Sequence, residues 1–409
     1  MDKKNSPFWA ALLTSLAAAF LLCGYEFLRS TSNSLYAAQF GTENLPVVQA
    51  LMPLGLLVLI YIYSWLLSWI GPKYTLLVTT LLSGIVIVAC YLAIQKGVGL
   101  AVGLLYIYRE AYIVLIIEQY WSFLNSSFGE QAARKFNGPV TGIASLGAIL
   151  AGYLLHYFTK TVGTHQMVLF AGLATLPAAL LSHIAYIKCG EPVPTEAEKK
   201  ESKGHLGLSL FKTEPILLLI IVLVMTTQVV STVLGLQFQT YLHATYPNMD
   251  DQTAYSGRFY ANLNILATVL QFGATPLVLK LLPMWLIHMF IPLIHLGACG
   301  FALFSPSIGS IGLAFMLFKA FDYSIFRAAK EILYIPLSFN SRYRAKEIID
   351  VFGYRTSKGL TSLSLVFLKH FGVLIESLYS WIALSAAAIW LGLILPLAIR
   401  IKKQQSSAD

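Results

Sequence analysis

Charged residues are scarce in this sequence. Asp, Glu, Lys and Arg make up 11% of its 409 residues, whereas a typical soluble domain carries about 25%. This scarcity excludes an ordinary soluble protein. Apolar residues instead make up 57% of the chain, in runs of 18 or more residues from end to end. Each run can cross a hydrocarbon core about 30 Å thick as a helix, so the composition predicts an all-α polytopic membrane protein.

Several kinds of site are also missing. The four cysteines lie far apart and the eight histidines are scattered, so neither a disulfide framework nor a metal site is predicted. No group of residues has the spacing of a nucleophile with its base, which argues against an enzyme and leaves no implied cofactor. The net charge of +9 is typical of cytoplasmic loops in a membrane protein, so we expect contact with lipid and a small solute and no nucleic acid.

Hydropathy predicts about twelve membrane spans. They lie near residues 8–30, 45–69, 74–95, 99–125, 138–160, 166–187, 214–242, 258–280, 284–304, 308–334, 349–375 and 379–400. Lys and Arg gather in the loops of one side, which predicts two cytoplasmic termini and, in our interpretation, a bacterial inner membrane.

The polar stretch 188–213 lies close to the middle of the chain and is rich in Pro, Glu, Lys and Gly. We interpret it as a cytoplasmic linker between two six-helix halves, 1–187 and 214–409. Six plus six spans with a cytoplasmic middle loop is the architecture of the major facilitator superfamily, and we expect a monomer. Repeated halves of this kind place the cargo site near mid-membrane.

Ionisable residues gather on three of the predicted spans. Such a residue costs several kcal/mol in hydrocarbon unless it is paired or faces water, so its presence indicates function. The first span carries Glu26 and Arg29, and the fourth carries Arg109, Glu110 and Glu118. The tenth span carries Lys319, Asp322, Arg327, Lys330 and Glu331. These spans line the central cavity of the facilitator architecture, together with the seventh, which carries Gln239.

Two roles compete for these residues. A cargo pocket would use Arg29, Arg109, Glu118, Lys319, Asp322, Tyr323, Lys330 and Gln239. Ion pairs that lock helices or seal a cytoplasmic gate would use Arg134, Arg327, Glu331 and Arg344. Helical spacing puts Lys319, Tyr323 and Lys330 on one stripe, with Asp322 within reach of Lys319. It also points Arg109 and Glu118 in roughly opposite directions, so one of them is expected to meet a neighbouring helix.

The stretch "YSIFRAAKEILYIPL", from Tyr323 to Leu337, is followed by "RAKEIID" and "SKG". It resembles the nucleotide translocase family, the ATP/ADP exchangers of plastids and intracellular bacteria. The stretches "YEFLRSTSNSL" and "EQYW" are similar to the family's first and fourth spans. The resemblance implies exchange by alternating access, with Glu118 and Lys330 orienting the cargo and Arg29 and Arg109 contacting its anionic group.

The chain also departs from this family. Basic residues of the family motifs are replaced at three matched positions, Ser32, Gln239 and Asp322. The remaining cations of the candidate cavity are Arg29, Arg109, Lys319 and Lys330, and its acids are Glu26, Glu110, Glu118 and Asp322. Because ATP would require a surplus of cations, this balance favours a less charged cargo, such as a nucleoside, a monophosphate, a zwitterion or an amphiphile. Together with the resemblance, it predicts a nucleotide or a less charged nucleotide-related solute as the cargo.

A second hypothesis keeps the fold and changes the energy source. It is a proton-coupled transporter of another small polar, zwitterionic or amphiphilic solute. Intramembrane carboxylates commonly carry the proton in such transporters. The candidates here are Glu26, Glu110, Glu118 and Asp322.

Overall fold

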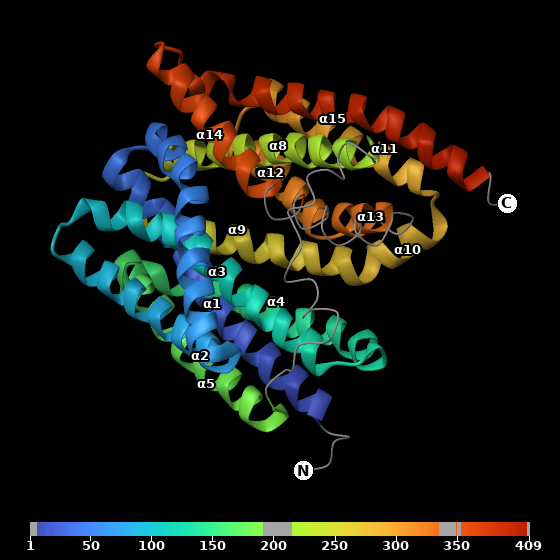
Figure 1. The fold of residues 1–409 in the computed structure, drawn as a ribbon. Helices are drawn as coiled ribbons and strands as arrows, with labels where there is room; N and C mark the ends of the chain where they lie inside the picture. Colours follow the sequence, from blue (N-terminus) through green and yellow to red (C-terminus); the bar gives the residue numbers. More distant parts are fainter. Residues whose placement is uncertain (1–5, 191–214, 335–348, 350–352, 407–409) are drawn as a thin grey trace. The chain divides into compact units, whose positions relative to one another are not determined.

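The computed structural model describes residues 6–190, 215–334, 349 and 353–406, and the regular elements in these ranges are all helices (Figure 1). The first half contains α1 (Ser6–Phe40), the short turn η1 (Thr42–Asn44), α2 (Leu45–Gln95), α3 (Gly99–Ser127), α4 (Glu130–Val162) and α5 (Thr164–Cys189). The second half contains α8 (Pro215–Thr245), α9 (Met249–Val269), the π-helical turn η3 (Leu270–Ala274), α10 (Thr275–Leu281), α11 (Met284–Phe304), α12 (Ile308–Tyr323), α13 (Ile325–Leu333), α14 (Tyr354–His370) and α15 (Ile375–Ser406). The predicted all-α class is confirmed.

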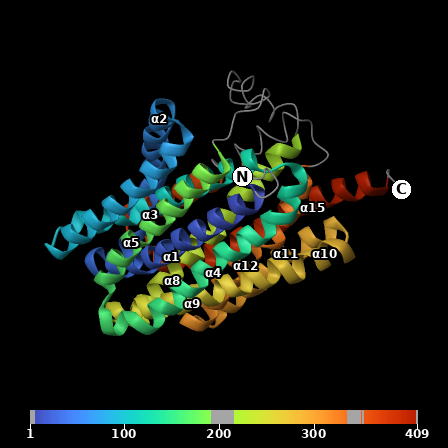
Figure 2. The ribbon, with the colours of Figure 1, turned by 90° about the horizontal axis from the view of Figure 1, so that it is seen from below.

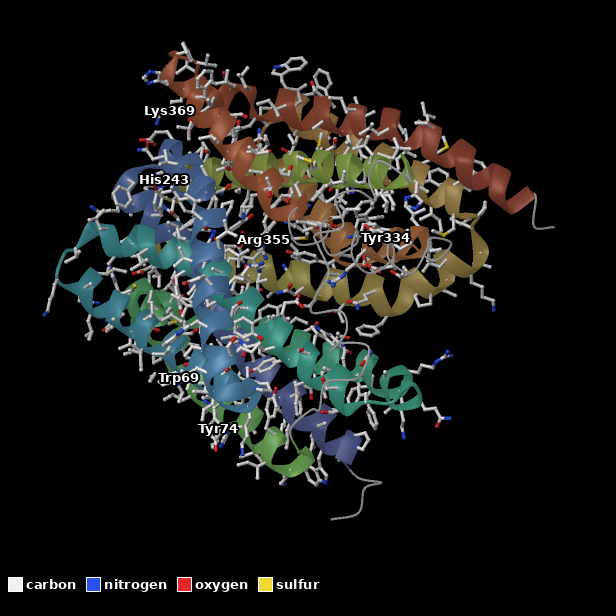
Figure 3. The ribbon with its side chains drawn as sticks, viewed as in Figure 1. Trp69, Tyr74, His243, Tyr334, Arg355 and Lys369 are labelled. Atoms are coloured by element: carbon white, nitrogen blue, oxygen red, sulfur yellow. The ribbon has the colours of Figure 1, made fainter. Side chains whose placement is uncertain are left out.

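Helix α2 is too long for one membrane crossing. Its 51 residues would rise about 75 Å, more than twice the thickness of the hydrocarbon core. The helix breaks at Gly71, whose φ of 74° lies in the left-handed region that favours glycine. Trp69 and Tyr74 flank this break and are exposed (Figure 3), as aromatic residues at a membrane interface are. α2 therefore supplies the second and third predicted spans.

Nine helices within the described ranges are long and apolar enough to cross a membrane, and α12 with α13 makes a tenth. α2 counts once among the nine although it is divided at Gly71. α14 has 17 residues and follows residues 350–352, which lie outside the described ranges. When α2 is taken as two spans and α14 as another, the described helices account for the twelve predicted spans.

The tenth span, expected to be one helix, is bent. α12 and α13 meet at Ser324 with a bend of 40°, and Ser324 has non-helical φ and ψ of −124° and −98°. The side-chain stripe predicted along this span is interrupted there. Tyr323, before the bend, is 39% exposed, whereas Lys330, after it, is 2% exposed. Side chains on the two sides of Ser324 do not share one stripe, because helical spacing places residues on a common face only along a continuous helix.

The described chain forms two compact units. Unit 1 comprises Met1–Gly41, Leu51–Ser202 and Tyr246–Asn264, and unit 2 comprises Thr42–Ala50, Lys203–Thr245 and Ile265–Asp409. Most of α9 lies in unit 1 and the start of α2 lies in unit 2, whereas the predicted halves divide at the linker, so the predicted division stays a prediction. The predicted linker, 188–213, falls almost entirely outside the described residues.

Helix α1 is central to unit 1. It lies between α4 and α5 and also packs against α3 (Figure 2). Its segment 30–34, "STSNS", is polar yet buried. The hydroxyls of Thr31, Ser32 and Ser34 donate to backbone carbonyls four residues earlier, at 2.7, 2.5 and 3.2 Å. This back-bonding satisfies the hydroxyls within their own helix, so a polar segment can occupy the centre of a bundle.

The part of α9 in unit 1 is held by hydrogen bonds and close packing. The backbone N–H and the Oγ1 of Thr164, at the start of α5, both donate to Asp250 Oδ1, at 2.8 and 2.6 Å. Farther along, Gly152 of α4 faces Gly257 of α9 so closely that a Cβ on Gly152 would lie 2.5 Å from the Gly257 carbonyl oxygen. Small residues allow such close approach of membrane helices.

In unit 2, α8 packs against α12, α14 and α15, and α11 packs against α15. Trp390 of α15 is 1% exposed, and its ring lies 5.3 Å from those of His295 and Phe326. The turn η1, directly before α2, is joined to the end of α14, where Lys369 Nζ donates to Asn44 Oδ1 at 3.0 Å.

Candidate cargo-binding site

Glu26 and Arg29 form an ion pair within α1. One terminal nitrogen of Arg29 donates to both carboxylate oxygens of Glu26, at 2.7 and 2.5 Å. The spacing of three residues puts the two side chains on one face of the helix. The Glu26 side chain is 4% exposed and that of Arg29 is 11% exposed. The pair is therefore largely buried, with Arg29 as its more accessible member.

Helix α9 completes the surroundings of this pair. The Tyr260 ring lies under the Arg29 guanidinium, 3.5 Å from its Cζ to the ring centroid, in a cation–π contact. Asn264 Nδ2 donates to Glu26 Oε1 at 3.0 Å. Tyr260 and Asn264 are four residues apart and so share a face of α9. Both members of the pair are thus oriented by a helix from the other half of the sequence.

Arg109 of α3 is the second cation of unit 1. It donates to the carbonyl oxygen of Arg29 at 2.8 Å and to Ser32 Oγ at 2.5 Å. Its Cζ lies 3.8 Å from the centroid of the Tyr106 ring, and its Nε lies 3.6 Å from Glu110 Oε1. Arg109 and Glu118 were predicted to point in opposite directions, with one of them meeting a neighbouring helix. Arg109 does so, because it bonds to α1.

Glu26, Arg29, Arg109 and Glu110 are hereafter the unit 1 charge network. Tyr25 joins its two ends, because its hydroxyl donates to Glu110 Oε1 at 3.3 Å and its ring centroid lies 5.5 Å from the Arg29 Cζ. Each cation has a carboxylate within 4 Å, so the network carries no net charge. The side chains of Glu26 and Arg109 are 4% exposed, whereas those of Arg29 and Glu110 are 11% and 14% exposed. The accessible part of the network thus combines one cation with one carboxylate.

Glu118 lies apart from this network. It is exposed and sits nine residues after Arg109, which corresponds to about 13 Å along the axis of α3. Arg109 and Glu118 therefore belong to different parts of the helix. Glu118 stays a candidate for cargo contact, and its placement differs from the buried position of Glu26.

In unit 2, the bend at Ser324 separates two buried charges. Asp322 of α12 is 8% exposed and Lys330 of α13 is 2% exposed. Among the described residues, Asp322 Oδ1 has no hydrogen-bond partner. The Asp322 carboxylate is attracted electrostatically by three cations, Lys319, Lys330 and Arg327. Lys330 Nζ donates to Tyr354 Oη at 3.5 Å. Lys319 is half-buried, with its Nζ 5.5 Å from the Tyr323 ring.

The remaining predicted residues are more dispersed. Gln239 of α8 is buried at 7% exposure, whereas Arg327 of α13 and Arg134 of α4 are exposed and Glu331 is half-buried. Arg344 lies outside the described residues. The gate role predicted for these four charged residues therefore stays a prediction.

Sequence reasoning missed Tyr260 and Asn264. Their signal was the polar start of the eighth predicted span, 258–280, where "RFYANLN" contains several hydrogen-bonding residues. A buried polar side chain in a span requires a partner, and the unassigned partners were the charges of the first span.

The comparisons with known proteins agree with this architecture. Residues 304–403 match the family model "TLC ATP/ADP transporter"; the match includes the tenth span, where the motif resemblance is most specific. The chain is 24% identical over 318 residues to ADP,ATP carrier protein 3 of Rickettsia bellii, covering 65% of this chain and 63% of the relative. It is 23% identical over 353 residues to the protein of the same name in Rickettsia conorii, covering 73% and 70%. This chain thus spans just under two thirds of the length of the Rickettsia bellii carrier.

Solved transporters share the fold. The nucleoside transporter NupG superposes with a TM-score of 0.68 over 96% of this chain and 99% of its own, at 12% identity. A D-xylose-proton symporter superposes with a TM-score of 0.66 over 95% and 97%, at 15% identity. The protein therefore has the all-α polytopic fold of the major facilitator transporters. Its sequence is similar to the ATP/ADP transporter model over residues 304–403 and to the Rickettsia carriers, which confirms the resemblance seen in the motifs.

Proposed function

We propose that this protein is a transporter of the nucleotide-translocase type. It would exchange a nucleotide, or a less charged nucleotide-related solute, by alternating access. The unit 1 charge network carries the proposal, because ionisable residues buried in membrane spans mark cargo pathways. The fold of transporters and the similarity to ADP,ATP carriers support it. We further propose a monomer in a bacterial inner membrane, with both termini cytoplasmic because Lys and Arg gather in the loops of that side.

The candidate residues differ in the roles that their surroundings support. Arg29 is the most accessible cation of the unit 1 network, at 11% side-chain exposure, and we assign it to cargo contact. We assign Lys330 to the same role in unit 2, together with Lys319, Asp322, Tyr323 and Gln239. The hydrogen bonds of Arg109 go to α1, so we assign Arg109 to holding α3 in place.

Uptake into proteoliposomes tests this function. Labelled adenosine and its mono-, di- and triphosphates are offered outside vesicles that are empty or preloaded with the same compounds. We expect uptake of at least one compound that depends on preloading, and its loss in Arg29→Gln and in Lys330→Gln. Arg258→Gln and Lys96→Gln are matched controls, because both residues are exposed. Uptake that is equal in all four variants would reject the site assignment.

Asp322 favours proton coupling as a second candidate function. It is a buried carboxylate whose Oδ1 has no hydrogen-bond partner in the described part of the chain. Such a group can take up and release a proton within a span. Uptake that follows an imposed pH gradient in empty vesicles, and is lost in Asp322→Asn, would select this function. Strict dependence on preloaded nucleotide with indifference to pH would reject it.

A further inference from the structure

The two cations of unit 1 already hold internal anions. The Arg29 guanidinium is paired with Glu26 at 2.5 Å, and the Arg109 Nε lies 3.6 Å from Glu110 Oε1. The Arg29–Glu26 pair is also fixed from α9, since Asn264 donates to Glu26 and Tyr260 lies against Arg29. A phosphate that approached Arg29 would have to compete with Glu26. It would also meet the negative charge of Glu110, whose side chain is 14% exposed.

We infer that Glu26 and Glu110 determine the specificity of this transporter by limiting the negative charge of its cargo. The inference rests on the proposed function and names its cargo class: a nucleoside or nucleoside monophosphate in preference to a di- or triphosphate. The reason is electrostatic. A neutral network offers a polyanion no net attraction, and its two carboxylates repel each added phosphate charge in a site where water screens little.

The accessible part of the network fits such a cargo. Arg29 offers hydrogen-bond donors and Glu110 offers acceptors, and both keep some exposed surface. A sugar or a base, which carries donors and acceptors without charge, can bond to both. The phosphate groups that ADP and ATP add carry acceptors only, so these groups can bond to Arg29 but not to Glu110. Rejection of the wrong cargo by a like charge is a common way to build specificity.

The test is a binding series on the purified full-length protein. Dissociation constants are measured for adenosine, AMP, ADP and ATP with the wild type and with Glu26→Gln, which keeps the shape of the side chain and removes its charge. We expect the wild type to bind adenosine or AMP most tightly. In Glu26→Gln the affinities should shift toward the phosphorylated compounds, by about tenfold for ATP relative to adenosine. The shift should shrink as salt is raised.

Two further variants keep the test decisive. Glu110→Gln removes the other carboxylate and should shift the series in the same direction, so it serves if Glu26→Gln fails to fold. Glu43→Gln removes the same charge from an exposed residue of η1 and should leave the order of affinities unchanged.

The possible results distinguish a failure of this inference from a failure of the proposed transport function. If the wild type prefers ATP, or if the order is the same in the wild type and both network variants, the charge-limiting role is overturned while nucleotide transport stands. If neither the wild type nor any variant binds any of the four compounds, the proposed cargo class and this inference are both refuted. A shift of equal size in Glu43→Gln would show a general effect of net charge and would also overturn the inference.

Discussion

Arg109→Leu removes the cation that joins α3 to α1, and the structure allows its cost to be worked out. Two hydrogen bonds disappear, to the carbonyl oxygen of Arg29 at 2.8 Å and to Ser32 Oγ at 2.5 Å. Hydrogen bonds between membrane helices contribute about 0.6 kcal/mol on average and about 1.7 kcal/mol at most. The two together therefore stabilise the unit by about 1–3 kcal/mol.

The same substitution leaves Glu110 without its arginine. Breaking a fully buried pair costs about 3–5 kcal/mol, a figure that already includes the hydrogen bonds of the lost partner. Here the Glu110 side chain is 14% exposed and Tyr25 still donates to it, so the lower end applies. We expect Arg109→Leu to lower the free energy of unfolding by about 3 kcal/mol.

Unfolding by SDS in mixed micelles, followed by tryptophan fluorescence, measures this change. Adding Glu110→Gln to Arg109→Leu removes the orphaned charge, so the double variant should be more stable than the sum of the single effects by about 1–2 kcal/mol. Arg258→Leu, at an exposed position of α9, should change stability by less than about 0.5 kcal/mol. A loss below about 1 kcal/mol for Arg109→Leu, or strict additivity, would refute the assignment of Arg109 as a helix lock.

Two further predictions concern the contacts that hold α9 in unit 1, and both use the same unfolding assay. Asp250→Asn weakens the charge-assisted bonds from the N–H and Oγ1 of Thr164 and should cost about 1–2 kcal/mol; an unchanged midpoint would contradict this. Gly152→Ala forces a methyl group against the Gly257 carbonyl and should cost about 1–3 kcal/mol. Gly103→Ala, which meets nothing within 4 Å, should not destabilise, and equal losses in the two glycine variants would contradict the packing argument.

Hydropathy predicted the spans because each apolar run matches the thickness of a bilayer. The break in α2 was also predictable, since Gly71 and Pro72 together end a helix. The bend at Ser324 was not. It lies in "FDYSIF", which contains neither glycine nor proline; in the structure the Ser324 hydroxyl donates to the Ala320 carbonyl at 2.6 Å, a back-bond of the kind that often bends helices. The faces of α12 and α13 could therefore be predicted separately but not as one stripe.

The members of the candidate site were partly predictable and their partners were not. Glu26, Arg29 and Arg109 stood out because charge is costly in hydrocarbon. Spacing along one helix also predicted the separation of Arg109 from Glu118. It could not show which neighbouring helix each charge would meet. Asn264 lies 238 residues from its partner Glu26, and only the packing of α9 in unit 1 brings the two together.

The sequence left two roles open for the intramembrane charges, cargo pocket and helix lock. We expect different members of the unit 1 charge network to take each role. Arg109 and Glu26, at 4% side-chain exposure, are the buried members, and Arg29 and Glu110 are the more accessible ones. Removing a buried charge that is bonded to neighbouring helices should lower stability together with transport. Removing the more accessible Arg29 charge also removes the proposed cargo contact, and Asn264 still donates to the Glu26 carboxylate that it leaves behind, so transport should fall more than stability. The ratio of the two losses, measured residue by residue, therefore assigns each charge to its role.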